Sequence, residues 1–156
     1  MSEHSATIAW RRETPDFTLP TFSRDHSVEF GTGQRLDMSS TLALRGNPKR
    51  VNPEELLVSA ISSCHMMTFL AVAAREGWVV DAYDDDALGY LEKNAEGRTA
   101  VTRVTLRPAV RFGGDLKPDA TALTKLHEKA HRGCFIAASV KTEVNVEPVA
   151  SLVPSD

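Results

Sequence analysis

The stretch that decides the fold is "NPEELLVSAISSCHMMTFLAVAAREG", residues 52–77. Asn52 is a good helix N-cap, Pro53 suits the first helical position, and Glu55 completes a start that resembles a capping box. Gly77 is a plausible C-cap. The stretch therefore predicts a single helix of about six or seven turns.

This predicted helix is apolar on nearly every side. One stripe along it consists of Leu57, Ala60, Ile61, Cys64, Met67, Thr68, Ala71 and Val72. Further apolar side chains lie off that stripe, namely Leu56, Met66, Phe69 and Leu70. A helix without a polar face is buried on several sides, either in a core or against another subunit. We therefore expect burial for this helix, with Met66 and Met67 filling core space.

The segments on both sides of this helix predict β-strands. Loose alternation over residues 7–45, around Gly31 and Gly33, predicts antiparallel strands with a hairpin turn. After the helix, residues 78–93 and 98–112 predict long strands with a turn between them.

The last part of the chain predicts a second helix and a closing strand. Residues 113–133 predict an amphipathic helix that Gly133 can end. Residues 134–139 predict a short helical turn, and residues 140–148 predict a strand. The order of hairpin, long helix, long strands, helix and strand predicts an α+β fold rather than an alternating βαβ pattern.

Length and composition exclude several classes of function. The 156 residues fit one domain, covering 1–156, which can bury a core without disulfides or metals. A net charge of -3 offers no basic patch, so we expect no nucleic acid partner. The N-terminal segment lacks a signal-peptide core, and no run of about 18 apolar residues occurs. We therefore expect a cytoplasmic protein without a membrane partner.

One motif raises the question of a metal. His127, Glu128 and His131 satisfy the zinc-peptidase pattern H-E-x-x-H, in which two histidines one turn apart hold the ion. No histidine follows His131 to complete the extended form of the pattern, and no third protein ligand is evident. Short motifs often match by chance. We therefore expect the solvated face of a helix and keep a zinc hydrolase as an alternative.

The two cysteines, Cys64 and Cys134, are the stronger candidates for chemistry. Cytosolic thiols are usually kept reduced, so a permanent structural disulfide between them is not expected. Cys64 on the apolar stripe could be a small core residue, whereas Cys134, directly after Gly133, is harder to explain by packing. His65 faces about 100° away from Cys64 on a helix. We therefore expect it to be a partly buried packing or hydrogen-bonding residue rather than a base for the thiol.

These residues resemble the signature of the OsmC/Ohr family of thiol-dependent peroxidases. The stretch "NPEELLVSAISSC", residues 52–64, matches its Asn-Pro-Glu-Glu-Leu start, its run of small residues and its cysteine at a fixed offset. The second cysteine, with an aliphatic helical turn and a terminal strand after it, also matches. The resemblance implies antiparallel sheets wrapped around a long buried central helix, in an intertwined homodimer with sites at its interface.

The resemblance also implies roles for individual residues. Cys64 would be the peroxidatic cysteine, Cys134 the resolving cysteine, and Glu54 the acidic partner of an essential arginine. The sequence "SRDHS" nominates Arg24 as that arginine, whereas a later strand points near Arg45. The Cys64 thiolate would attack a hydroperoxide, become a sulfenic acid and condense with Cys134 to a disulfide. A cellular dithiol, lipoyl or other, would then reduce the disulfide.

Helix geometry adds an expectation about the dimer. Ten helical residues separate Glu54 from Cys64 by about 15 Å along a straight axis. Two antiparallel copies of the helix would bring one chain's Glu54 toward the other chain's Cys64. Together with the resemblance, this implies a homodimeric two-cysteine hydroperoxide reductase that acts on organic peroxides, with hydrogen peroxide as a candidate second substrate, and needs no metal or tightly bound organic cofactor. A non-catalytic binding module of the same fold is a further alternative.

Overall fold

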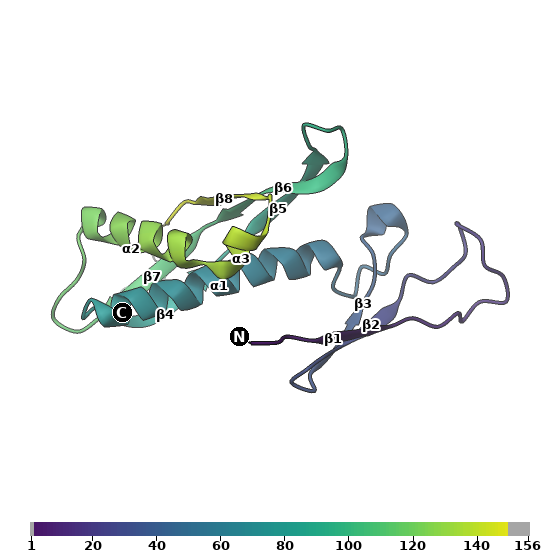
Figure 1. The fold of residues 1–156 in the computed structure, drawn as a ribbon, viewed down its shortest axis with the longest axis horizontal. Coiled ribbons are helices and arrows are strands. Elements are labelled where there is room, and N and C mark those ends of the chain that lie inside the picture. Colours follow the sequence, from purple (N-terminus) through teal and green to yellow (C-terminus); the bar gives the residue numbers. More distant parts are fainter. Residues whose placement is uncertain (1, 150–156) are drawn as a thin grey trace. The chain divides into compact units, whose positions relative to one another are not determined.

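The computed structural model describes residues 2–149, which divide after Leu56 into two compact units. Helices and mostly antiparallel strands are both present, which confirms the predicted α+β class (Figure 1). The prediction of one domain over residues 1–156 stays a prediction.

The first unit holds a three-stranded antiparallel sheet in the order β1-β2-β3. Its strands are β1 (Ala6–Ala9), β2 (His26–Phe30) and β3 (Arg35–Met38). The turn between β2 and β3 contains Gly33 at φ 83°, a left-handed conformation that glycine adopts without steric cost. The predicted antiparallel strands and hairpin turn are therefore confirmed.

The predicted strand pattern does not continue beyond β3. The chain instead forms the 3₁₀ helix η1 (Leu42–Leu44), and the amide of Gly46 donates to the carbonyl of Thr41 at 2.9 Å. A side chain at Gly46 would collide with the carbonyl oxygen of Ser40. The strand prediction for residues 39–45 is thus wrong, because this segment satisfies its backbone groups within a tight turn.

Helix α1 (Pro53–Arg75) begins with the predicted capping box. Asn52 Oδ1 accepts from the amide of Glu55 at 2.9 Å, and Glu55 Oε2 accepts from the amide of Asn52 at 3.0 Å. Amides that the helix start leaves without intrahelical partners are thereby paired. Gly77, at φ 83°, follows the last turn as expected for a C-terminal cap.

Replacing Asn52 with alanine is expected to lower the free energy of unfolding by about 1 kcal/mol, because the helix start loses its side-chain acceptor. Urea titration followed by far-UV circular dichroism measures the change. Glu55→Gln is the matched control, since glutamine also serves in a capping box, and it should cost less. An unchanged urea midpoint in Asn52→Ala would show that packing alone fixes this helix start.

The second unit contains most of α1, two β-sheets and two shorter helices (Figure 1). Its further elements are β4 (Val79–Asp85), β5 (Leu88–Lys93), β6 (Thr99–Leu106), β7 (Pro108–Gly113), α2 (Ala120–Gly133), α3 (Phe135–Ser139) and β8 (Glu143–Val146). Strand β4 pairs antiparallel with β7, β5 pairs antiparallel with β6, and β8 joins β6 in parallel. The short helical turn and the closing strand lie within the predicted ranges. The second helix ends at Gly133 as predicted but begins only at Ala120, because Asp119 caps it by accepting from the amide of Ala122 at 2.7 Å, so the predicted start at residue 113 is wrong.

Each of the two predicted long strands is broken in the structure. Residues 78–93 contain β4 and β5, and residues 98–112 contain β6 and most of β7. At the break Asp85 Oδ1 accepts from the amide of Arg107 at 2.6 Å, and Pro108 has no amide hydrogen to donate. Each continuous run of residues therefore supplies strands to two different sheets.

Helix α1 buries one narrow side in this unit. That side consists of every fourth residue, namely Ile61, His65, Phe69 and Ala73. The first of these packs with Val104 and Leu106 of β6, and the last two pack with Leu126 and Ala130 of α2. The predicted stripe omits Phe69, because a helix that is apolar on every side carries no periodic signal for the side that is buried.

The opposite side of α1 is exposed in the single chain. It is lined by small or flexible side chains, namely Ala60, Ser63, Met67, Ala71 and Ala74. Met67 is 59% exposed, so the prediction that it fills a core is wrong within one chain, whereas Met66 is half-buried. Several-sided burial of this helix would therefore require a further partner.

By length and composition alone, α1 could also cross a membrane. Its most apolar window has a mean hydropathy of 1.8, and 22% of that window is buried. Core helices of soluble proteins pass the same test, so one such helix is weak support for a membrane span.

Candidate active site

Two elements of the second unit bring Cys64 and Cys134 together. Cys64 lies half-buried in the middle of α1, and Cys134, only 1% exposed, lies between α2 and α3. Cys134 Sγ accepts from the amide of Ala137 at 3.4 Å, and the Cys64 side chain lies near enough to act on the pKa of the Cys134 thiol. Both cysteines are free. The second unit thus brings the two thiols near one another, as disulfide chemistry between them requires.

The two thiols differ in their surroundings. Burial, and next the nearby Cys64 side chain, raise the pKa of the Cys134 thiol above its ordinary value, although the Ala137 amide opposes this. Cys134 therefore remains protonated at neutral pH. Cys64 is the cysteine with exposed surface. An external reagent would thus meet Cys64 first.

The end of α2 lies tightly against α1 beside Cys64. A methyl group at Gly133 would come within 2.9 Å of Thr68 Cγ2. Thr68 Oγ1 in turn donates to the carbonyl of Cys64 at 2.8 Å. Because Gly133 has no side chain, the end of α2 can approach α1 closely at the residue before Cys134.

A buried histidine pair also joins α1 to α2. His65 is 1% exposed and His127 is 4% exposed. His65 Nε2 lies 3.2 Å from His127 Nδ1, and the two rings are 5° from parallel. The ring of Phe69 packs against His127 with a centroid separation of 4.5 Å. His65 is thus a hydrogen-bonding residue, as the sequence predicts, although it is fully buried.

The prediction that the H-E-x-x-H motif is a solvated helix face is wrong for His127. Glu128 and His131 are exposed, whereas His127 points into the core. Residues 2–149 contain no group of three or more histidine, cysteine or acidic side chains that could hold a metal ion. The sequence matches the motif, but its first histidine, His127, belongs to the buried side of α2 and serves packing.

The buried pair predicts an acid-sensitive stability. Burial lowers the pKa of His65 and of His127 from 6.5 to about 4, so the unfolded chain takes up protons first as the pH falls. The stability that the neutral pair preserves is complete above pH 6.5 and is lost as the pH falls toward 4, by up to about 1.4 kcal/mol per pH unit for each histidine. Urea titrations at several pH values measure this slope. His65→Gln/His127→Asn should flatten it, and His4→Asn, at an exposed position, should not.

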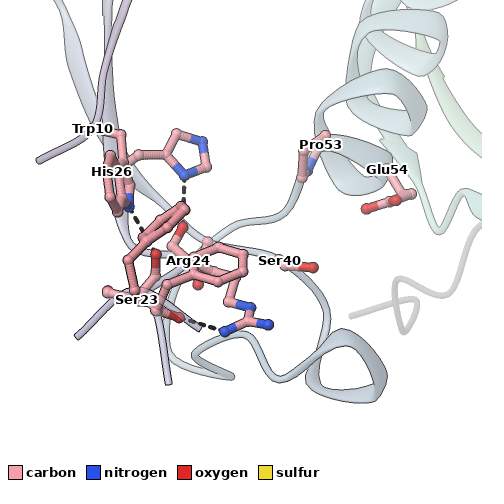
Figure 2. A pocket seen from close by; sticks show the side chains of 10 residues that line it. Trp10, Ser23, Arg24, His26, Ser40, Pro53 and Glu54 are labelled. Carbon is pink, nitrogen blue, oxygen red and sulfur yellow. Dashed lines mark hydrogen bonds between the residues drawn. The ribbon is translucent and has the colours of Figure 1, made fainter. Parts of the chain in front are cut away.

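The first unit holds a pocket of about 340 Å³ that contains two further predicted site residues (Figure 2). Its lining consists of Trp10, Phe17, Phe22, Ser23, Arg24, His26, Ser39, Ser40, Pro53 and Glu54. The rings of Trp10 and Phe17 lie 5.8 Å apart, and those of Phe17 and Phe22 lie 5.4 Å apart. A pocket with aromatic walls and a mostly apolar lining surface suits an organic ligand.

Arg24 is held in this pocket by backbone carbonyls and an aromatic ring. Its Nη2 donates to the carbonyl of Leu19 at 2.6 Å, its Nη1 donates to that of Phe22, and its Cζ lies 3.7 Å from the centroid of the Phe22 ring. Glu54 Oε2 is buried without a hydrogen-bond partner among the described residues. The pocket thus presents a cation and a carboxylate oxygen that still lacks a donor.

The other candidate arginine lies elsewhere in the same unit. Arg45 ends η1 in a left-handed conformation, φ 65°, with an exposed side chain. Of the two candidates, the structure brings Arg24 to the pocket that Glu54 lines. The role of either arginine in supporting Cys64 stays a prediction.

Comparison with known proteins identifies the family. A family model described as OsmC-like protein matches residues 46–149. The chain belongs to the OsmC-like protein family. The resemblance inferred from the sequence is therefore confirmed.

Individual OsmC-like proteins agree with this assignment. The chain is 27% identical over 108 residues to the uncharacterized protein YmaD of Bacillus subtilis, which covers 69% of this chain and 71% of the relative. It is 28% identical over 99 residues to the peroxiredoxin OsmC of Escherichia coli, covering 64% and 66%. An OsmC-like protein of unknown function from Vibrio cholerae shares 45% identity at a TM-score of 0.91, over 96% of this chain and 100% of that one.

A more distant solved structure shows the same fold. The organic hydroperoxide resistance protein OhrB of Bacillus subtilis has a TM-score of 0.69 at 18% identity, covering 95% of this chain and 98% of that one. The long central helix and antiparallel sheets of the OsmC/Ohr fold are thus confirmed for this chain.

Two features of the site escape prediction from the sequence. His127 is recognised there only as part of a zinc motif, and its partnership with His65 needs the packing of α1 on α2. The sequence does not predict the aromatic walls formed by Trp10, Phe17 and Phe22, because these residues lie mainly in loops without periodicity. The density of aromatic residues before β2 is the signal that could have indicated them.

Proposed function

We propose that this OsmC-like protein is a thiol-dependent peroxidase that reduces organic hydroperoxides through Cys64 and Cys134. The observation that carries the proposal is the proximity of two free thiols in the second unit, Cys64 on α1 and Cys134 between α2 and α3. Membership of the OsmC-like family and the similarity to a peroxiredoxin OsmC also support it.

The proposed reaction has two oxidative steps. First the Cys64 thiolate attacks the distal oxygen of the hydroperoxide, the O–O bond breaks, and the alkoxide takes up a proton and leaves as an alcohol. Cys64 is then a sulfenic acid. Next the Cys134 thiol attacks its sulfur, the disulfide forms, and water leaves. A cellular dithiol, lipoyl or other, returns both cysteines to thiols by disulfide exchange.

The surroundings of Cys64 on α1 support the choice of substrate. Apolar side chains one turn away on either side, Ile61 and Met67, favour the organic part of an alkyl hydroperoxide over hydrogen peroxide. Arg24, with its fixed guanidinium, is the better candidate for stabilising the negative charge of the Cys64 thiolate, with Glu54 as its acidic partner. Arg45 remains the alternative.

The exposed side of α1 supports the proposal of a homodimer. Its small side chains, at Ala60, Ser63, Ala71 and Ala74, allow a second helix to approach closely. We propose that two copies pack α1 against α1 in the cytoplasm. Sedimentation equilibrium should give twice the chain mass, and Ala71→Glu should shift the protein toward monomer. A wild-type protein that stays monomeric at micromolar concentration would contradict this proposal.

The test of the peroxidase is a count of thiols. Fully reduced protein is mixed with tert-butyl hydroperoxide, and free thiols and peptide masses are measured. Both thiols should disappear, and mass spectrometry should find a Cys64–Cys134 link within one chain. Survival of both thiols in excess peroxide would contradict the enzyme and favour a non-catalytic binding module.

A further inference from the structure

The buried pair of His65 and His127 has no part in the peroxidase steps, yet it lies between the two reacting cysteines along the chain. His65 directly follows Cys64 on α1, and His127 precedes Cys134 by seven residues on α2. Seven residues are almost two helical turns, so positions 127 and 134 face nearly the same way. The histidine pair and the two thiols therefore lie at neighbouring positions of α1, opposite α2 and the turn that follows it.

A hydrogen bond at this place fixes distance and direction more narrowly than an apolar contact would. The 3.2 Å bond links His65 Nε2 to His127 Nδ1, and Phe69 covers the His127 ring. An apolar pair of similar size could pack there without the cost of burying polar groups. Two ring nitrogens, His65 Nδ1 and His127 Nε2, are in fact buried without a partner in the described part of the chain. The histidine pair therefore stabilises the fold less than an apolar pair of similar size would. Its presence is explained if the position that its hydrogen bond fixes is needed.

A second contact completes the attachment of α2. Gly133 lies against Thr68, and Thr68 donates to the carbonyl of Cys64. The His65–His127 pair and the Gly133–Thr68 contact together fix the position of the last two turns of α2 on α1. Cys134 follows at once, and its Sγ is held further by the amide of Ala137. A shift of α2 would therefore move one sulfur relative to the other.

We propose that the His65–His127 hydrogen bond positions the Cys134 turn against Cys64 and thereby governs how readily the Cys64–Cys134 disulfide forms. Both histidines are positioning residues, because no step of the proposed reaction uses either ring. The inference rests on the proposed function for its biological meaning, although disulfide formation itself can be measured without any peroxide. Misplacement of reacting atoms by about 1 Å can slow a reaction by about a hundredfold.

The experiment compares two double variants that differ in the hydrogen bond. His65→Leu/His127→Leu removes the bond and leaves no unpaired polar group, so its free energy of unfolding should equal or exceed that of wild type at neutral pH. His65→Gln/His127→Asn keeps the bond, because the glutamine amide can replace Nε2 and the asparagine amide can replace Nδ1. His131→Asn, an exposed site on the same helix, is the control for substitution of a histidine.

The first readout is the equilibrium with oxidised and reduced glutathione. In this equilibrium one oxidised glutathione takes two electrons from the two thiols, and the products are the Cys64–Cys134 disulfide and two reduced glutathiones. The effective concentration of one thiol at the other should fall about ten- to a hundredfold in the leucine variant. It should return close to the wild-type value in the amide variant. The chain has no other cysteine, so the thiol count is unambiguous.

The second readout uses tert-butyl hydroperoxide and a dimedone trap for the sulfenic acid. The rate of Cys64 oxidation should be unchanged in the leucine variant, while the sulfenic acid should live longer before Cys134 resolves it.

A wild-type effective concentration in the leucine variant would overturn the positioning role. An equal loss of effective concentration in the amide variant would also overturn the positioning role, whatever the cause of that loss. If wild type ignores the peroxide but the glutathione result holds, the proposed peroxidase fails and the positioning role stands.

Discussion

Cys64→Ser should lower the rate of alkyl hydroperoxide reduction by at least about a thousandfold, because the proposed reaction then has no nucleophile. A serine hydroxyl at this place is protonated at neutral pH and cannot form a sulfenic acid. The rate is measured as peroxide consumption with a dithiol as the reductant. Far-UV circular dichroism of the variant should match wild type, since the half-buried Cys64 contributes little volume to either core cluster.

Cys134→Ser is the matched variant, because it removes the other thiol of the same pair. It should still consume one equivalent of peroxide per chain and should then stop with Cys64 as a sulfenic acid that dimedone labels. Full turnover in Cys64→Ser would contradict the proposed mechanism outright. Full turnover in Cys134→Ser would instead show that an external thiol resolves Cys64, which would remove the proposed role of Cys134.

The start of α1 could be predicted from the sequence because its signals are local. Asn52, Pro53 and Glu55 act within one turn, and the capping box forms as expected. The pairing of Cys64 with Cys134 depends on the whole second unit. It became predictable only through the resemblance to a family, since seventy residues separate the two cysteines.

The buried side of α1 could not be predicted, because the helix offers apolar residues in every direction. Partners in other elements select Phe69 and His65, and these partners follow from tertiary packing. For the same reason the expectation that His127 lies on the solvated face of its helix is wrong. A pattern of residue types within one helix cannot say which of its polar members finds a buried partner on another helix.

Arg24→Gln should slow the oxidation of Cys64 by about a hundredfold, the usual effect of removing one fixed donor from a developing negative charge. The structure supports this choice because two carbonyls and the Phe22 ring hold the Arg24 guanidinium in one place. Stopped-flow mixing with tert-butyl hydroperoxide measures the second-order rate constant. Arg24→Lys keeps the charge without the planar fork and should recover only part of the rate.

The same measurement decides between the two arginines and tests Glu54. Arg45→Gln should cost far less than Arg24→Gln, since Arg45 is exposed and lies outside the pocket lining. Glu54→Gln should cost roughly tenfold, because a neutral amide orients a guanidinium less firmly than a carboxylate does. Arg35→Gln, an exposed position on β3, controls for loss of a positive charge. A larger loss at Arg45 than at Arg24 would reverse the assignment, and equal small losses would mean that neither arginine supports the Cys64 thiolate.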